Sequence, residues 1–409
     1  MAITGLKVQL KDTVLGTAKQ SNGNCMIVYG VATAFTDDAV FTNGLGLIAS
    51  ADDARQNTQI SKDAHLLAMI EKFYAVAGAG AKLWIYAGKT AAKDDFVTAN
   101  KEAIKRAIIT TGAATFDNRP RIVGYVSSAE DTAPTGTTGY PAALNTLIAG
   151  IQSISDDLFK DGYRIVNVVA PNVDADILSV VSKAAASTDF GTLAPVAPSV
   201  GVVATTSVTD ASGKPLKDVG EVLGLCASVG IQESIGSVAR SSVSAQAYFN
   251  SLSAKTAVEV GTLTTALFEA LGAKQVIFHR TRVQRSGRYY NDAATCNEAT
   301  KALSEIQYVR VANVVCDDAE YYFQGIINTN VPLDSNGNAQ SSYLGAIEDE
   351  FYNTYCSPRI ASGQVSDIRV TVNGDKFIDK RTLTVTIEIL PSPTCREIYV
   401  YTYYVTQIA

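Results

Sequence analysis

The chain has 409 residues and a formal net charge of −6 at pH 7; 47% of its residues are hydrophobic and 18% are charged. This composition excludes a disordered or fibrous chain, and the length exceeds the roughly 250–300 residues that one hydrophobic core spans, so about two domains are expected. The negative charge and the lack of a Lys/Arg cluster argue against nucleic-acid binding, and no stretch reaches the ~18 apolar residues of a membrane span.

The first residues predict an extended arm. Leu6, Val8 and Leu10 alternate with polar residues, as in a strand with one apolar face. Residues 17–24 then form a polar, Gly-containing connection. We therefore expect residues 1–24 to be an N-terminal arm. The strand either pairs outside its own domain or completes a sheet within the same chain, and the pattern leaves both arrangements open.

Residues 25–245 predict an α/β domain, because short apolar runs alternate with helical patterns. Strands are expected at 27–31, 83–86, 122–126, 165–169 and 200–204, and helices at 64–77, 96–109, 144–158 and 177–186. Helices should cover both faces of such a sheet. Sheets of this kind often bind nucleotides at their strand ends, but no phosphate-binding motif is found there. Gly88-Lys89-Thr90 comes nearest, and Leu83 stands where that motif needs an earlier glycine.

A second, α+β domain is expected at residues 246–394. A Gly-, Ser- and Ala-rich stretch at 201–236 precedes the softest boundary, at 241–254. Beyond it the pattern predicts helices at 263–271, about 298–327 and 343–355, and strands at 275–278 and 383–389. Residues 398–405 alternate like the first arm, so residues 395–409 are expected to form a C-terminal arm strand.

Cysteine and histidine positions exclude most site chemistry. No two of the six cysteines lie within four residues of each other, which rules out CxxC metal or redox motifs. Without an export signal, reduced thiols in a cytosolic product are expected. His65 and His279, the two histidines, are expected to be structural. We therefore expect no catalytic, cofactor-binding or metal-binding residue, although Ser or Cys hydrolases remain formally open because their partners meet in space.

Three segments carry motifs that can be compared with a known family. The first joins the arm to Val28-Tyr-Gly-Val-Ala-Thr and then to a helix, a Gly-rich turn and an aromatic strand at 73–86. The second is Arg288-Tyr-Tyr-Asn-Asp292 before a long helical stretch, and the third is the strand-rich ending from 368 to 405. Together these segments, over nearly the whole chain, resemble the tail-sheath proteins of contractile phage tails and related injection machines.

The resemblance implies a structural protein that is not an enzyme and has no cofactor. Family subunits form hexameric rings stacked helically around an inner tail tube protein, and the sheath contracts from a metastable extended state. Baseplate and tail terminator proteins are the other implied partners, in a virion tail or contractile particle assembled in the bacterial cytoplasm. The implied arm residues that link subunits are Leu6, Val8, Leu10, Ile398, Val400 and Tyr401, and the implied tube-facing residues are Glu348, Asp349 and Glu350.

Other interpretations remain open at this point. An α/β ligand-binding protein or enzyme with a C-terminal oligomerisation domain would have a pocket at its strand ends. Another virion or shell protein with exchanged strands is also possible. Residues 348–350 fit the solvated face of a helix as well as they fit a tube contact.

Overall fold

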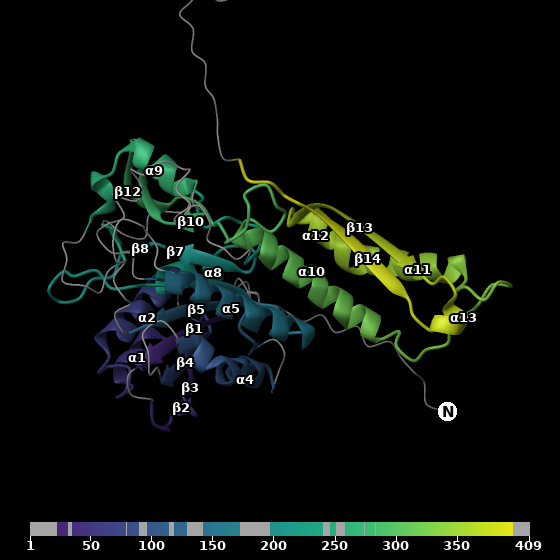
Figure 1. Ribbon diagram of the computed structural model, residues 1–409, viewed down its shortest axis with the longest axis horizontal. Helices are drawn as coiled ribbons and strands as arrows, with labels where there is room; N and C mark the ends of the chain where they lie inside the picture. The colour runs from purple at the N-terminus through teal and green to yellow at the C-terminus, as the bar shows by residue number, and fades with distance from the viewer. Residues whose placement is uncertain are drawn as a thin grey trace, which may run out of the picture.

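The computed structural model describes residues 23–31, 35–78, 80–89, 96–113, 118–128, 142–171, 197–239, 246–250, 258–273, 275–282 and 284–395. An α/β body forms one end of the molecule, and an elongated C-terminal unit, from α10 to β14, projects from it (Figure 1). The fold class is α/β with small antiparallel sheets, as the sequence predicted. The helix expected at 177–186 and the strand expected at 398–405 lie outside the described residues.

The body is built on a sheet that has eight strands among the described residues, in the order β10-β7-β6-β5-β1-β4-β3-β2. Their bounds are β1 Cys25–Val31, β2 Phe41–Thr42, β3 Leu45–Ile48, β4 Leu83–Lys89, β5 Ile122–Ser127, β6 Val166–Val169, β7 Val200–Val203 and β10 Val276–Ile277. Pairings from β10 to β4 are parallel, and β3 and β2 add an antiparallel edge. All seven residues of β1 are buried, because the strand is covered on both faces.

Helices cover both faces of the sheet. On one face lie α1 (Ala51–Gln56), α2 (Ala64–Ala77) and α8 (Gly220–Ser228), which pack against alternate β1 residues such as Ile27. On the other face, which includes Met26, lie α3 (Phe96–Ala99), α4 (Lys101–Gly112), α5 (Ala142–Lys160) and α9 (Thr265–Gly272). The strands predicted at 27–31, 83–86, 122–126, 165–169 and 200–204, and the helix predicted at 64–77, are confirmed.

Two parts of the body differ from the predicted elements. The helix expected at 96–109 is interrupted at Asn100, whose side-chain amide donates a 2.7 Å hydrogen bond to the carbonyl oxygen of Phe96. The Gly-rich stretch contains the buried helix α8, which no pattern predicted. Its glycines allow close packing, since a Cβ at Gly220 would lie 2.1 Å from the Met69 carbonyl oxygen in α2.

The C-terminal unit has its own smaller core. Its elements are α10 (Ile306–Gln324), α11 (Ser341–Phe351), a π-helix (Tyr352–Cys356), α12 (Ser357–Ala361), β13 (Val365–Asn373), α13 (Phe377–Lys380) and β14 (Thr384–Pro391). Val314, Phe351 and Ile368 are among its buried residues. The first turns of α10 belong instead to the body, where Ile306 packs into the core beside the sheet. Helix α10 therefore joins the two cores.

The body extends past the boundary expected near residues 241–254. The short strands β8 (Thr205–Thr206) and β9 (Tyr248–Phe249) pair with each other, and a 3₁₀ helix (Val260–Thr262) follows. Strand β10 then completes one edge of the large sheet, and Phe268 and Phe278 pack into its core. The hairpin of β11 (His279–Arg282) and β12 (Arg285–Tyr290) leads from there to α10. We propose that the C-terminal unit begins within α10.

Candidate assembly surfaces

A buried polar cluster in the body has the order of groups found in acyl-transfer enzymes. The Thr205 hydroxyl lies 2.8 Å from His279 Nδ1, and His279 Nε2 lies 3.3 Å from Glu221 Oε2. This hydroxyl, imidazole and carboxylate sequence is that of a catalytic triad. All three side chains have an exposed fraction of 0%, so no substrate reaches them. The cluster instead ties β8, β11 and α8 together inside the core.

Asp218 is a second buried carboxyl group beside this cluster, and it titrates differently from Glu221. Burial, reinforced by the charge of Glu221, raises the pKa of Asp218 to about 7. Burial also opposes ionisation of Glu221, but His279 beside it and a 2.6 Å hydrogen bond from the Ser207 hydroxyl outweigh this and lower its pKa. The core therefore holds one charged carboxylate and one carboxyl group that titrates near neutral pH. The sequence signal that could have pointed to this cluster is the presence of Lys217, Asp218 and Glu221 among the apolar residues of segment 216–226.

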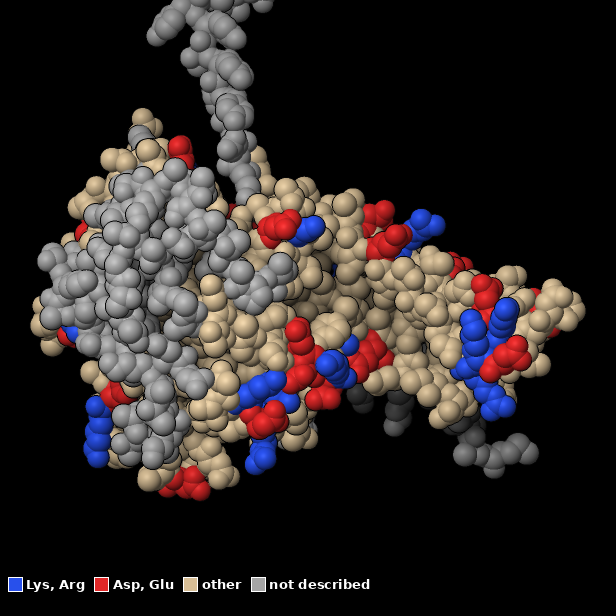
Figure 2. Space-filling model, in the orientation of Figure 1, with Lys and Arg blue, Asp and Glu red and all other residues tan. Residues whose placement is uncertain are grey.

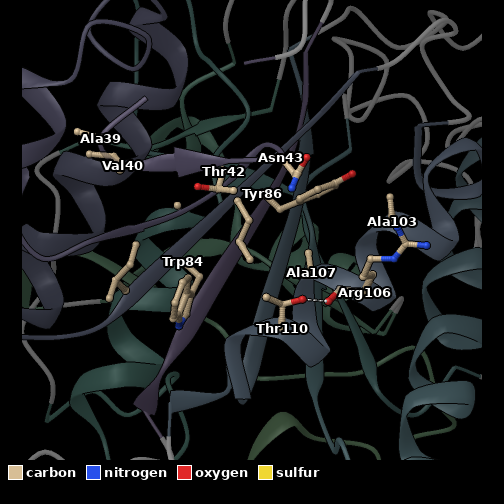
Figure 3. Close-up of a pocket in the computed structure, with 13 residues that line it drawn as sticks. Ala39, Val40, Thr42, Asn43, Trp84, Tyr86, Ala103, Arg106, Ala107 and Thr110 are labelled. Atoms are coloured by element: carbon tan, nitrogen blue, oxygen red, sulfur yellow. Dashed lines mark hydrogen bonds between the residues drawn. The ribbon is translucent and has the colours of Figure 1, made fainter. Parts of the chain in front are cut away.

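A groove of about 650 Å³ lies at the antiparallel edge of the sheet (Figure 3). Strands β2, β3 and β4 form one wall, with Trp84 and Tyr86 facing the groove, and α4 forms the other with Arg106 and Thr110. No Asp, Glu, His or Cys is among its described lining residues, and Arg106 is the one charged residue there. The groove therefore lacks groups for acid–base chemistry. The loops that follow β1, β4, β5 and β6, where a strand-end pocket was considered, fall mostly outside the described residues.

An arginine network connects the body to α10. Asp317 of α10 accepts from Arg119 at 2.5 Å, from Arg164 at 2.8 Å and from Arg121. Arg164 also contacts Glu320 at 2.6 Å. Sequence reasoning missed this network because its members are about 150–200 residues apart.

On the face shown in Figure 2, basic and acidic side chains of the described residues lie next to one another rather than in large patches of one sign.

The hairpin of β13 and β14 is a sheet whose two strands have no further neighbour among the described residues. Strand β13 packs on α11, and β14 contacts α10. The inward residues Ile368 and Val372 of β13 are 2% and 5% exposed. The equivalent residues of β14 are only half-buried: Val385, Ile387 and Ile389. The burial of the inward-facing side chains thus decreases from β13 to the outer strand β14.

The hairpin's exposed edges are chemically suited to accept a strand. An edge strand presents unpaired backbone N–H and C=O groups, and a two-stranded sheet is marginal by itself. The outward face is polar, with Arg369 and Glu388 3.8 Å apart and both mostly exposed. A strand added beside β14 would pair its backbone and also cover the half-buried side chains.

The three acidic residues expected to face the tube lie near the end of α11, but they have different surroundings. Glu348 accepts a 2.6 Å hydrogen bond from the backbone N–H of Val372, and Glu350 accepts one of 2.9 Å from the Tyr322 hydroxyl. Asp349 is exposed, and its side chain has no partner among the described residues. Glu348 and Glu350 therefore serve the unit's own packing, and Asp349 is the member that is free for another molecule.

The expected arm residues Leu6, Val8, Leu10, Ile398, Val400 and Tyr401 all fall outside the described residues. Among the residues that are described, no group of three His, Cys, Asp or Glu side chains is placed to hold a metal ion. None of the described helices is both long and apolar enough to cross a membrane.

The whole chain has the fold of contractile sheath subunits, as the sequence resemblance predicted. The structure of the anti-feeding prophage helical sheath in its contracted state matches with a TM-score of 0.59 at 10% identity, over 100% of both chains. The contracted sheath complex of the PVC extracellular contractile injection system matches with a TM-score of 0.58 at 11% identity, over 99% of this chain and 98% of the other. A sheath tail protein from Listeria innocua gives 0.52 at 12%, over 90% and 92%. No family model and no curated protein sequence matches the chain.

Proposed function

We propose that this chain is the structural subunit of a contractile sheath. It polymerises helically around an inner tail tube protein and contracts from a metastable extended state, which drives the tube through a target envelope. The observation that carries the proposal is the full-length match to a subunit of a helical sheath. The groove at the sheet edge and the buried Thr205–His279–Glu221 cluster offer no competing catalytic chemistry.

Strand exchange through the arms links the subunits in this proposal. Residues 6–11 and 398–405 within the two arms alternate apolar and polar side chains, and the hairpin of β13 and β14 has edges that can pair with such strands. A strand from a neighbour would cover Val385, Ile387 and Ile389. The donor and acceptor surfaces differ, so the contact is heterologous, and contacts of this kind that do not close generate helical assemblies.

The energy for contraction is stored in the assembly, so no nucleotide or other cofactor is required. Hexameric rings change from one lattice to a more stable one while the linked arms keep neighbours connected. Baseplate and tail terminator proteins bound the polymer at its two ends, in a virion tail or contractile particle assembled in the bacterial cytoplasm. The exposed Asp349 of α11 contacts the tube, and Glu348 and Glu350 hold the helix in position for it.

A matched pair of triple variants tests the arm linkage. Replacing Leu6, Val8 and Leu10 by Ser removes the apolar side of the predicted strand, and replacing Lys7, Gln9 and Lys11 by Ser changes the other side. We expect the first variant to remain folded but to form no tubes, whereas the second assembles. Circular dichroism reports folding, and sedimentation with electron microscopy reports assembly. Tubes of normal length from the apolar-side variant would refute the arm linkage.

A further inference from the structure

One face of α10 is covered by the body near the start of the helix and bare near its end. Arg310 on this face donates a hydrogen bond to the Gly230 carbonyl oxygen. Asp317, seven residues later, accepts one from Arg119 of the body. Residues four and seven apart lie on one face of a helix, so Tyr321 continues this face, yet it is 76% exposed. The face of α10 therefore extends beyond the part that the body covers.

Two more large apolar side chains are exposed near Tyr321. Phe159, in the last turn of α5, is 46% exposed, and Ile327, in the turn that follows α10, is 66% exposed. Arg164 joins the two helices, because its guanidinium lies 4.8 Å from the centre of the Phe159 ring and 2.6 Å from Glu320 of α10. We call Phe159, Tyr321 and Ile327 the α10 patch. Exposed apolar patches of this kind mark contact sites.

The described chain begins next to the same helix. The side-chain amide of Asn24 donates a 3.3 Å hydrogen bond to the Arg119 carbonyl oxygen, and its own carbonyl oxygen accepts one of 2.8 Å from the Arg121 backbone N–H. The side chains of Arg119 and Arg121 both contact Asp317 of α10. Residues 1–22 therefore leave the body beside α10.

The N-terminal segment carries an apolar pair, Val14-Leu15, that lies outside the alternating arm pattern. Eight residues separate Leu15 from Gly23, and an extended chain spans about 3.3 Å per residue, so the pair reaches about 26 Å from the body. Tyr321 lies one helical turn, about 6 Å, beyond Asp317. The patch is thus well within reach of the pair.

We propose that the α10 patch binds Val14 and Leu15 of the same chain and thereby fixes the direction in which the N-terminal arm leaves the subunit. A segment tethered this closely has an effective concentration on the order of millimolar, which favours it over a second copy in dilute solution. The alternating residues 6–11 lie beyond the contact and stay available to a neighbour. Because the contact is intramolecular, it forms whether or not the chain assembles into a sheath.

Hydrogen exchange of residues 12–22 tests the contact in the full-length chain, at a concentration where sedimentation shows monomers. We expect these amides to exchange about tenfold more slowly than in a synthetic peptide of residues 1–22. The double variant Tyr321→Ser, Ile327→Ser should lose this protection, and Ile378→Ser, at a residue 59% exposed on α13, should keep it. The replaced side chains are exposed, so all variants should fold, which circular dichroism checks.

A reporter on α10 gives the reciprocal test. In Tyr321→Trp, replacing Val14 and Leu15 by Ser should shift the indole emission to longer wavelength, over a constant contribution from Trp84. Replacing Thr13 and Thr17 by Ser should leave the emission unchanged.

Two results would overturn the proposal. One is exchange of the wild-type segment at the rate of the free peptide. The other is protection that appears only in assembled tubes, which would show that a neighbour covers the patch. Monomers that keep the protection but never form tubes would uphold the contact and contradict the proposed sheath function instead.

Discussion

The sheet of the body and the hairpin of the C-terminal unit contrast in how far each is completed by its own chain. In the body every residue of β1 is buried, and helices cover both faces. In the hairpin, β14 alternates between exposed and half-buried residues, and its outer edge has no strand beside it among the described residues. The sheet of the body is therefore covered by helices of its own chain. The C-terminal unit instead has the features of a structure completed by another molecule.

The largest expected losses of stability come from variants in the two hydrophobic cores, and they show whether the body and the C-terminal unit unfold separately. Phe73 and Phe351 both have an exposed fraction of 0%, one in the body and the other in the C-terminal unit. Changing either to Ala should cost about 3–5 kcal/mol of the local stability. We expect Phe73→Ala to lower the stability of the whole chain, and Phe351→Ala to raise amide hydrogen exchange in the C-terminal unit alone. Equal exchange throughout the chain in Phe351→Ala would show that the two regions unfold together.

The next variant removes the negative charge of Asp317, whose ion pairs join α10 to the body. Asp317→Asn leaves Arg119, Arg121 and Arg164 without their shared carboxylate charge and should cost about 3 kcal/mol, because the remaining cations stay buried. Denaturant unfolding measures the loss. Asp157→Asn is the matched control, since its ion pairs with Lys101 and Lys105 are at the surface and should matter much less. Equal losses from both variants would contradict the bridging role of α10.

A pH effect is expected from Asp218 in the body. The pKa of Asp218 rises from 3.8 in the unfolded chain to about 7 in the folded one, so the folded state retains a proton that the unfolded state has lost. The resulting stabilisation is present below about pH 4 and is lost as the pH rises to about 7. Each pKa unit corresponds to about 1.4 kcal/mol, so the change is about 4 kcal/mol.

Asp218→Asn should flatten this decline, since the amide oxygen still accepts from the Gly220 backbone N–H without becoming charged. Urea unfolding at pH 4.5 and 7.5 compares the variant with the wild-type chain. The same loss of stability in both proteins would mean that another group titrates in this range.

A variant in the hairpin should reduce the stability of the isolated subunit less than the core variants do, yet it should prevent assembly. Ile387→Ser on β14 should cost about 1 kcal/mol, because the side chain is only half-buried, yet it should prevent assembly by removing a contact of the added strand. Thr386→Ser, on the exposed face of the same strand, is the control. Normal tubes from the Ile387→Ser variant would place the acceptor edge elsewhere.

The smallest effect on the subunit should come from Asp349→Lys. The side chain is exposed and has no partner among the described residues, so the unfolding curve should not change. Assembly around the inner tube protein should nevertheless weaken, because the charge at the proposed contact is reversed. Unaltered assembly with the tube protein present would remove Asp349 from that contact and leave it as a solvated surface residue.

Sequence patterns predicted the parallel core because their information is local. Buried strands such as β1 are short, continuous apolar runs, and α2 begins at an Asp63 cap and ends at Gly78, with a φ of 72°. Helix α8 was missed because its glycines lower helix propensity, although they permit contact with α2. Contacts such as Arg119–Asp317 depend on how distant segments meet, and no local pattern encodes them.

The central claim is that this chain forms open-ended tubes through exchanged strands. Negative-stain electron microscopy of the purified full-length protein, across a series of salt and protein concentrations and with the inner tube protein added, tests it most directly. The account predicts striated hollow tubes or stacked rings. A uniform population of small closed oligomers under every condition would contradict it and favour an α/β ligand-binding protein or enzyme with a C-terminal oligomerisation domain.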